Sequence, residues 1–133
     1  TSGSLVIRVN QLPPATSSPN ARVHWSERKR DADIYAKAVY YECVQLRNNI
    51  ETNGHERFAP LYRARVDLTF VFREKRRRDP DNLVARFKPG LDAVVRAGLL
   101  FDDRADLITI GRPKIEVDPA RAPETIIVLT EAR

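Results

Sequence analysis

The sequence predicts an α+β fold: a small mixed β-sheet of about four strands, in the order β-α-β-α-β-β, with two helices on one face. Three observations lead to this prediction. Residues 61–73 alternate between apolar and polar side chains, residues 31–47 repeat apolar positions at helical spacing, and further apolar segments lie near both ends of the chain. A length of 133 residues suits one domain with a single core, and we expect that domain to span residues 1–133.

The first half of the chain predicts a strand, a loop and a helix. Residues 4–10 (SLVIRVN) are a short apolar segment typical of a strand, and residues 11–22 are rich in Pro, Ser and Asn, which predicts a loop. A helix is predicted over residues 31–47 because its apolar side chains share one stripe, namely Ala36, Val39, Tyr40, Cys43 and Leu46. We expect residues 48–60 to form a turn-rich connection.

The second half predicts most of the sheet. In residues 61–73 one side of the strand carries Tyr62, Ala64, Val66, Leu68 and Phe70. Residues 99–110 begin as an apolar segment and enter another strand. We expect residues 112–119 and 124–132 to form an antiparallel pair that completes the sheet.

A second helical segment follows the charged stretch that ends the strand at 61–73. We expect residues 82–88 to be an irregular turn and the regular helix to begin near Pro89, because a proline disfavours helical geometry in the residue before it. From there the core-facing side chains are Leu91, Val94 and Val95. The helix is expected to end near Ala97, with Gly98 as its C-terminal cap.

Composition sets limits on the class of protein. Lys and Arg number 23 against 18 Asp and Glu, a net charge of +5, which is compatible with a polyanionic partner. No run approaches the roughly 18 apolar residues needed to span a bilayer, and no signal-peptide pattern opens the chain. A single cysteine, Cys43, excludes an intramolecular disulfide and a Cys-based zinc cluster. We expect a cytoplasmic protein in which Cys43 is a small core residue rather than a reactive thiol.

The stretch KRRRDPDN (75–82) places four cations directly before two carboxylates. One interpretation is a helix start, with Asp79 as the N-cap, Pro80 at the first helical position and Asp81 favoured by the helix dipole. That interpretation accounts for both carboxylates without any chemistry. It leaves the arginine run unexplained, and also the second acidic pair, Asp102 and Asp103, that follows the helical segment.

The alternative interpretation is a metal site. In an extended stretch Asp79 and Asp81 would point the same way, and a third carboxylate from Asp102 or Asp103 could join them. Oxygen ligands of this kind suit Mg²⁺, whereas His24 and His55 lack the ligand spacing that zinc sites show. Two more charged side chains lie between the acidic pairs: Lys88, and Asp92, which could face the cluster or serve as a helix-start carboxylate.

Residues 76–103, RRRDPDNLVARFKPGLDAVVRAGLLFDD, resemble the signature of the RusA family of Holliday junction resolvases. An early loop also resembles the family, with Pro19, Asn20 and Trp25 in its places. The spacing between Asn82 and Lys88 is about three residues longer than in the shorter family members, which leaves Arg86 as an alternative to Lys88. The matching positions are Asp79, Asp81, Asn82, Leu83, Lys88, Leu91, Asp92, Ala93, Ala97, Gly98, Asp102 and Asp103.

The resemblance implies a homodimeric endodeoxyribonuclease that requires Mg²⁺, with Mn²⁺ as a substitute, and resolves four-way DNA junctions in recombination and repair by paired nicks. It implies that Asp79, Asp81 and Asp103 are the metal-binding catalytic carboxylates. It implies that Lys88 is the catalytic or DNA-contacting lysine. A two-fold axis would place a second site on the symmetry-related strand.

The cations before the carboxylates then have a purpose, because a carboxylate cluster alone would repel DNA. We expect DNA contacts from Arg86, Asn20 and Trp25 and from the run Lys75, Arg76, Arg77 and Arg78. The alternative for the run is a solvated strand edge. Trp25 and Phe101 could stack on unpaired bases, although Phe101 lies in an apolar run that also suits the core. A non-catalytic module that binds branched or single-stranded DNA is the competing function.

Overall fold

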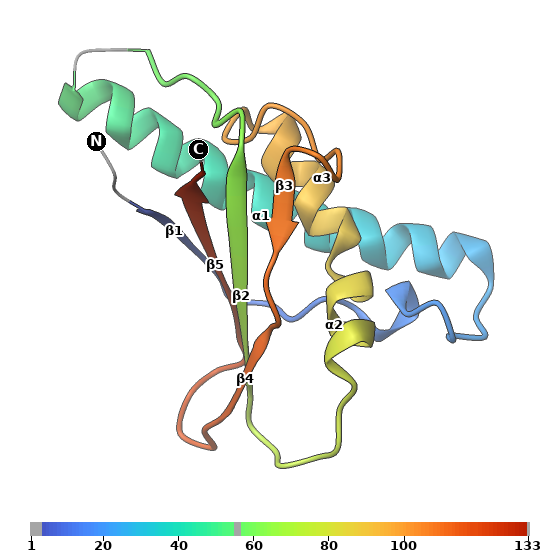
Figure 1. Ribbon diagram of the computed structural model, residues 1–133. Coiled ribbons are helices and arrows are strands. Elements are labelled where there is room, and N and C mark those ends of the chain that lie inside the picture. The colour runs from blue at the N-terminus through green and yellow to red at the C-terminus, as the bar shows by residue number, and fades with distance from the viewer. Residues whose placement is uncertain (1–3, 55–56, 133) are drawn as a thin grey trace.

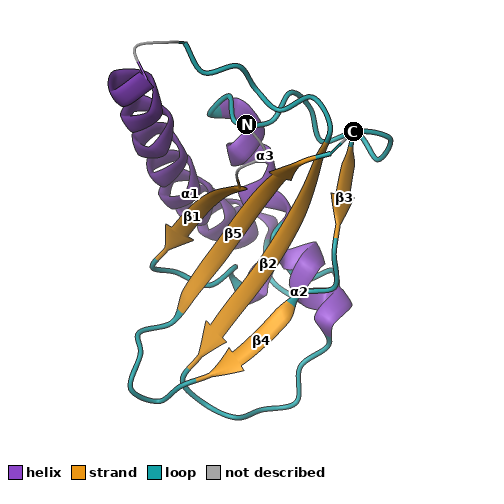
Figure 2. Cartoon of the chain, turned by 60° about the vertical axis from the view of Figure 1, so that its left-hand side comes forward, coloured by secondary structure: helices purple, strands orange, loops and turns teal. Residues whose placement is uncertain are grey.

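The computed structural model describes residues 4–54 and 57–132 (Figure 1). Within them a five-stranded mixed sheet carries three α-helices on one face (Figure 2), so the α+β class is confirmed, whereas the predicted order with about four strands and two helices is wrong. The elements in chain order are β1 (Ser4–Val9), the short 3-10 helix η1 (Ala15–Ser17), α1 (Trp25–Gly54), β2 (Ala64–Phe72), α2 (Pro80–Arg86), α3 (Lys88–Arg96), β3 (Ile108–Ile110), β4 (Lys114–Val117) and β5 (Glu124–Glu131).

The sheet is built around β2 and β5. β1 pairs with β5, and β5 with β2, in antiparallel fashion. β3 and β4 both pair with β2 in parallel, β3 along Ala64–Val66 and β4 along Thr69–Phe72, so together they form one edge strand with an interruption at residues 111–113. Pro113 has no N–H to give to a ladder, which accounts for the interruption there.

The predicted antiparallel pairing of residues 112–119 with 124–132 is wrong. β4 lies beside β2, and β5 inserts between β1 and β2 instead. The physical reason is the apolar run in β5. Ile127 and Leu129 are fully buried and the alternating side chains Ile126, Val128 and Thr130 are half-buried, which suits a strand with a neighbour on each side.

β2 confirms the clearest alternation in the sequence. Ala64, Val66, Leu68 and Phe70 are buried beneath the helices, as their period of two predicts. Tyr62 does not share this burial: it lies before the strand and is 53% exposed. The buried face of β2 forms one continuous core with the inner faces of α1, α2 and α3.

α1 is longer than the apolar stripe predicted. Its buried face holds Tyr35, Ala36, Val39 and Cys43, whereas Tyr40 is 43% exposed and does not belong to that face. The helix continues to Gly54, so the expected turn-rich connection is wrong over residues 48–54. Within these added turns Glu51 forms an ion pair with Arg47 one helical turn earlier, at 3.6 Å, and accepts a hydrogen bond from the backbone N–H of Phe58 at 2.8 Å. His55 lies outside the described residues.

Residues 82–88 are helical rather than an irregular turn. α2 ends at Arg86 and α3 begins at Lys88, so Phe87 joins the two helices. Leu83 and Phe87 are both fully buried, and their spacing of four places them on one helical face. That apolar pair stabilises α2 against the core, which overrides the preference of the residue before Pro89 for extended geometry.

α3 packs closely against α1 at Gly90. A Cβ atom at this position would lie 2.8 Å from Phe87 Cε1 and 2.9 Å from Tyr35 Cε2, so a side chain would push the helices apart. Leu91 is buried as predicted. The predicted C-terminal cap is confirmed, because Gly98 has a φ of 85°, a conformation that glycine adopts without strain.

None of the helices in residues 4–54 and 57–132 combines the length and the apolar character needed to cross a bilayer.

Candidate nucleic-acid interface and acidic cluster

The charged stretch begins α2. Asp79 is its N-cap: the Asp79 Oδ1 atom accepts a hydrogen bond from the backbone N–H of Asp81 at 3.0 Å, and Pro80 occupies the first helical position. Asp81 lies in the first turn, where a carboxylate is favoured by the helix dipole. The helix-start interpretation of both aspartates is therefore confirmed.

The expected extended geometry of the two aspartates is wrong. The chain turns into the helix at Pro80, so Asp79 and Asp81 stand in different backbone conformations. Asp79 lines a cavity rich in arginine. Asp81 instead lines a shallow hollow with Ile110 and Arg112, beside the interruption between β3 and β4. The capping hydrogen bond thus separates two carboxylates that a strand would have aligned.

A second charged group lies at the start of α3. Lys88 Nζ donates to Asp92 Oδ1 at 3.2 Å, one helical turn away, and also to Asp103 Oδ2 in the loop after α3. The backbone N–H of Asp103 donates to Asp102 Oδ1 at 2.7 Å. We call Lys88, Asp92, Asp102 and Asp103 the lysine cluster. Asp92 thus shares Lys88 with Asp103. This contact agrees with the interpretation that Asp92 faces the acidic pair, rather than with a helix-start carboxylate.

The lysine cluster is paired internally. The hydrogen bond to Asp103 raises the pKa of Lys88, and the same contact with Lys88 holds the pKa of Asp103 below its usual range. Both shifts favour the charged forms, as expected for opposite charges in contact. Neither side chain is deeply buried, so the pair is accessible to solvent and to ligands.

The fit of a metal ion to these residues is incomplete. The donor chemistry suits Mg²⁺, because Asp79, Asp81 and Asp103 offer only oxygen. The geometry does not, because no three Asp, Glu, His or Cys side chains among residues 4–54 and 57–132 form a group able to hold a metal ion. An ammonium group, that of Lys88, contacts both Asp92 and Asp103.

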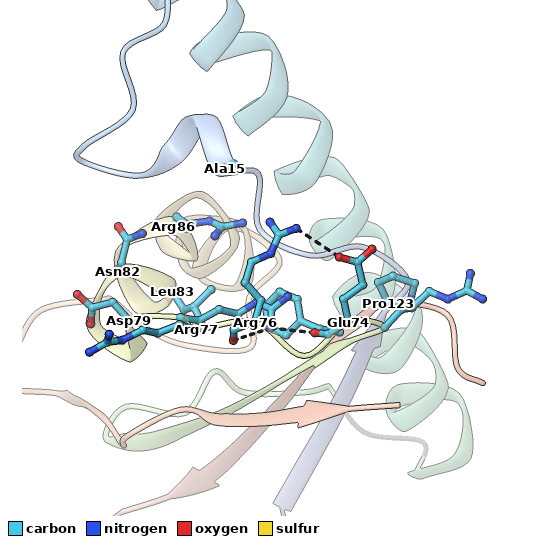
Figure 3. Close-up of a pocket in the computed structure, with 12 residues that line it drawn as sticks. Ala15, Glu74, Arg76, Arg77, Asp79, Asn82, Leu83, Arg86 and Pro123 are labelled. Carbon is cyan, nitrogen blue, oxygen red and sulfur yellow. Dashed lines mark hydrogen bonds and ion pairs between the residues drawn. The ribbon is translucent and has the colours of Figure 1, made fainter. Parts of the chain in front are cut away.

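Five arginines line one cavity of about 540 Å³ between the loop after β2, α2 and the early loop. Figure 3 shows Asp79, Asn82 and Arg86 around this cavity, together with residues of the loop after β2. Arg76 forms an ion pair with Glu74 at 3.3 Å, and Arg77 has no ion pair with another described residue. We call this feature the arginine cavity, defined by Arg73, Arg76, Arg77, Arg78 and Arg86.

Arg78 shapes the loop after β2. Its guanidinium lies 3.6 Å from the centre of the Phe72 ring, and its Nη1 atom donates to the carbonyl oxygens of Glu74 and Arg76 at 3.1 and 3.2 Å. Burial lowers the pKa of Arg78, and the nearby charge of Arg76 lowers it further. Arg78 therefore closes the loop upon itself and brings the neighbouring cations to the cavity.

Arg86 lies at the α2 side of the cavity and is half-buried. Its Nη2 atom donates to the carbonyl oxygen of Pro13 at 2.7 Å, which ties α2 to the early loop. Burial lowers the pKa of Arg86, and the positive charge of Arg78 adds to this effect. Arg86 was the alternative to Lys88 as the catalytic cation, but the two lie in different environments. Arg86 lies in the arginine cavity and has no ion pair with a described carboxylate, whereas Lys88 pairs with Asp92 and Asp103.

The other expected DNA contacts lie outside the arginine cavity. Lys75 and Asn20 are exposed, and the backbone N–H of Asn20 donates to Ser18 Oγ at 3.2 Å. Trp25 is 68% exposed at the start of α1. Phe101 is 55% exposed and packs on Tyr62 with the ring centres 5.0 Å apart, so of its two interpretations the core position is wrong.

Three polar or charged cavity residues, Arg73, Glu74 and Asn82, were not among the expected contacts. Asn82 accepts a hydrogen bond from Ser18 Oγ at 2.8 Å through Oδ1, and Glu74 pairs with Arg76. Asn82 directly follows Asp81 in the stretch that resembles the RusA signature, so the sequence marked its position without indicating its partner. Nothing in the sequence pairs Ser18 with α2, because that contact spans 64 positions.

Comparison with known proteins places the chain beside one relative. No family model matches it. An uncharacterized protein of Xylella fastidiosa (strain Temecula1) is 33% identical over 120 residues, which cover 89% of this chain and 71% of that protein. The chain belongs to the same family as this Xylella protein.

Proposed function

We propose that the chain is a structure-selective endodeoxyribonuclease that resembles the RusA Holliday junction resolvases and cuts four-way DNA junctions. One observation carries the proposal: the RusA-like run over residues 76–103 begins at a strongly cationic cavity with Asp79 at its edge and ends at a cluster of Lys88 with Asp103. Cations that attract a polyanion thus precede the carboxylates proposed for the chemistry.

The cations have two distinct roles in this proposal. Arg76 and Arg77 offset the repulsion between DNA phosphates and carboxylates, and hold the strand near Asp79. Lys88 would stabilise negative charge that develops on phosphate oxygens, a role that suits an ammonium held in place by two carboxylates.

Mg²⁺ is expected from the resemblance and from the oxygen-only donors of the three aspartates, with Mn²⁺ as a substitute. Asp79, Asp81 and Asp103 would have to come together to bind this ion. Among the described residues of one chain they do not form such a group. A homodimer is part of the proposal for the same reason that it is expected in the family: paired cuts on symmetry-related strands need two sites related by a two-fold axis.

A second candidate function is a non-catalytic module that binds branched or single-stranded DNA. The lysine cluster favours it, because Asp92 and Asp103 already have a cation between them. Such a module would use the arginine cavity alone and would bind DNA in a salt-sensitive way without nicking it.

The two candidates are separated by incubating the protein with a synthetic four-way junction and with a linear duplex of the same sequence, with and without Mg²⁺. The nuclease predicts paired nicks in the junction, in the presence of the metal, and little cutting of the duplex. Asp79→Asn and Asp103→Asn should each lower the cleavage rate by about 100-fold or more while binding persists or tightens, because a negative charge near the phosphates is removed.

Asp67→Asn is a matched control, because Asp67 pairs with Arg65 and belongs to neither the arginine cavity nor the lysine cluster. Cleavage that survives both Asp79→Asn and Asp103→Asn would show that the carboxylates are assigned wrongly. Tight junction binding by the wild-type protein with no nicking in Mg²⁺ or Mn²⁺ would favour the binding module.

A further inference from the structure

We propose that the arginine cavity is a discrete binding site for one phosphodiester group of a DNA strand, separate from the lysine cluster. The identification of the ligand as DNA rests on the proposed function. The existence of a phosphate site rests on the charges, donors and shape of the cavity itself.

The first argument is the balance of charge. Five guanidinium groups line the cavity against two carboxylates, those of Glu74 and Asp79. Glu74 is paired with Arg76, and Asp79 Oδ1 is used by the backbone N–H of Asp81. Most of the positive charge is therefore left without a carboxylate partner, which is the arrangement that attracts an anion.

The second argument is the crowding of like charges. Arg78 lies close enough to Arg86 to lower its pKa, and burial lowers the pKa of both. Arg86 Nε is buried and donates to no acceptor among the described residues. A cation that is partly removed from water with an unmatched donor costs free energy, and a bound anion offsets that cost.

The third argument is the set of available donors. Asn82 Oδ1 accepts from Ser18 Oγ, so the Nδ2 group of Asn82 is the part of the amide left to donate. Arg77 has no hydrogen bond to another described residue. A phosphodiester offers only acceptors to these groups, and guanidinium groups bind it with paired hydrogen bonds.

The side chains that line the cavity indicate that it holds the sugar-phosphate backbone of DNA rather than a base. Phe72 is the one aromatic side chain among the described lining residues, and the Arg78 guanidinium already covers its ring. A base would find no free aromatic face for stacking. The proposed site therefore binds a phosphate group and does not recognise the base sequence. It would place that phosphate in the cavity that Asp79 also lines.

The test uses three probes titrated into the wild-type protein without divalent metal: inorganic phosphate, thymidine 5′-monophosphate and the dinucleotide dTpT, with binding followed by backbone amide NMR. We expect dTpT to bind at least as tightly as inorganic phosphate and to shift the amides of the loop after β2 and of α2 first. Binding of the monophosphate and inorganic phosphate but not of dTpT would overturn the diester assignment in favour of a free-nucleotide site.

Asn82→Asp is the sharpest variant. It keeps the acceptor for Ser18 Oγ but replaces the Nδ2 donor with a carboxylate oxygen, so the fold should persist while dTpT affinity falls at least tenfold. Arg77→Gln should lower affinity about threefold, and Arg96→Gln, which removes one positive charge outside the cavity, should change it less than twofold.

Equal dTpT binding by wild type, Asn82→Asp and Arg77→Gln would overturn the proposal. So would a loss in Arg96→Gln as large as that in Asn82→Asp, because binding would then follow net charge alone. Since no cleavage is measured, a protein that binds dTpT in the cavity but never nicks a junction would retain this site while refuting the nuclease proposal.

Discussion

The arginine cavity and the lysine cluster lie at successive points of the same segment, yet their cations are in opposite states. In the cavity, burial and a like charge lower the pKa of Arg86. In the cluster, hydrogen bonds to carboxylates raise the pKa of Lys88. The first cation lacks an anion and the second has two in contact. The comparison shows that most cations of the arginine cavity lack a carboxylate partner, as the proposed phosphate site requires, whereas Lys88 already contacts two carboxylates and would have to exchange one of them before it could act on a phosphate.

The largest effects should come from changes that divide binding from cleavage. If the cluster does the chemistry, Lys88→Gln should lower the cleavage rate at saturating protein by about 100-fold and leave junction affinity within a few fold. The double variant Arg76→Gln/Arg77→Gln should have the opposite effect. It should weaken junction binding about tenfold and reduce the slope of log affinity against log salt concentration by about two.

Single-turnover cleavage and salt-dependent binding measure the two quantities separately. The division of roles would be refuted if Lys88→Gln weakened junction binding as much as the double arginine change and left the saturating rate unchanged. Lys88→Arg is the informative companion variant, because it preserves the charge but not the compact shape of the ammonium.

A smaller effect is expected at the joint that holds both regions in place. Gly90→Ala would bring a methyl group to within 3 Å of the rings of Phe87 and Tyr35, both of which are fully buried. We expect a loss of about 1–3 kcal/mol in the free energy of unfolding, despite the better helix propensity of alanine. Urea denaturation measures this loss. Gly54→Ala is the matched control, because nothing lies within 4 Å of a Cβ atom there.

Unchanged or increased stability in Gly90→Ala would show that α2 and α3 can shift relative to α1. The two charged regions would then not be held in a fixed relation, and the contrast between them would depend on conformation.

The smallest effect concerns the pH dependence of the lysine cluster. Because the pKa of Asp103 is lowered below 3.8, its contribution to stability is present above that pH and is lost as pH falls through the lower, folded value. Because the pKa of Lys88 is raised above 10.5, its contribution is present below pH 10.5 and is lost as pH rises past the folded value. The pair is solvent-accessible, so we expect a few tenths of a kcal/mol.

Comparing the stability of wild type and Lys88→Gln across pH 2–11 isolates this contribution. A difference that is constant through pH 5–9 and shrinks at both extremes is expected. A difference that changes near neutral pH would mean that another titrating group contacts the cluster.

Much of the fold could be predicted because local pattern and tertiary burial agree. β2 alternates with period two, and both the Asp79 cap and the Gly98 cap depend on neighbouring residues alone. α2 could not be predicted in the same way. The pair Leu83 and Phe87 stabilises it only because a core exists beneath them, and Pro89 suggested a break at that place.

In the candidate site, too, local contacts could be predicted from the sequence and contacts between distant segments could not. The contact between Lys88 and Asp92 is local, at a spacing of one helical turn, and the sequence offered it as one of two interpretations of Asp92. The separation of Asp79 from Asp81 could not, because it depends on where the strand conformation ends. The tie between Asn82 and Ser18 joins distant segments, and only the folded chain shows it.

The two margins of the sheet have unequal consequences for self-assembly. On one side β3 and β4 contribute three and four residues with Pro113 just before β4, a short and broken border that resists the addition of a further strand. On the other side β1 is a continuous six-residue strand whose outer border faces no other described strand. A dimer that extended the sheet across a two-fold axis would therefore join β1 to β1.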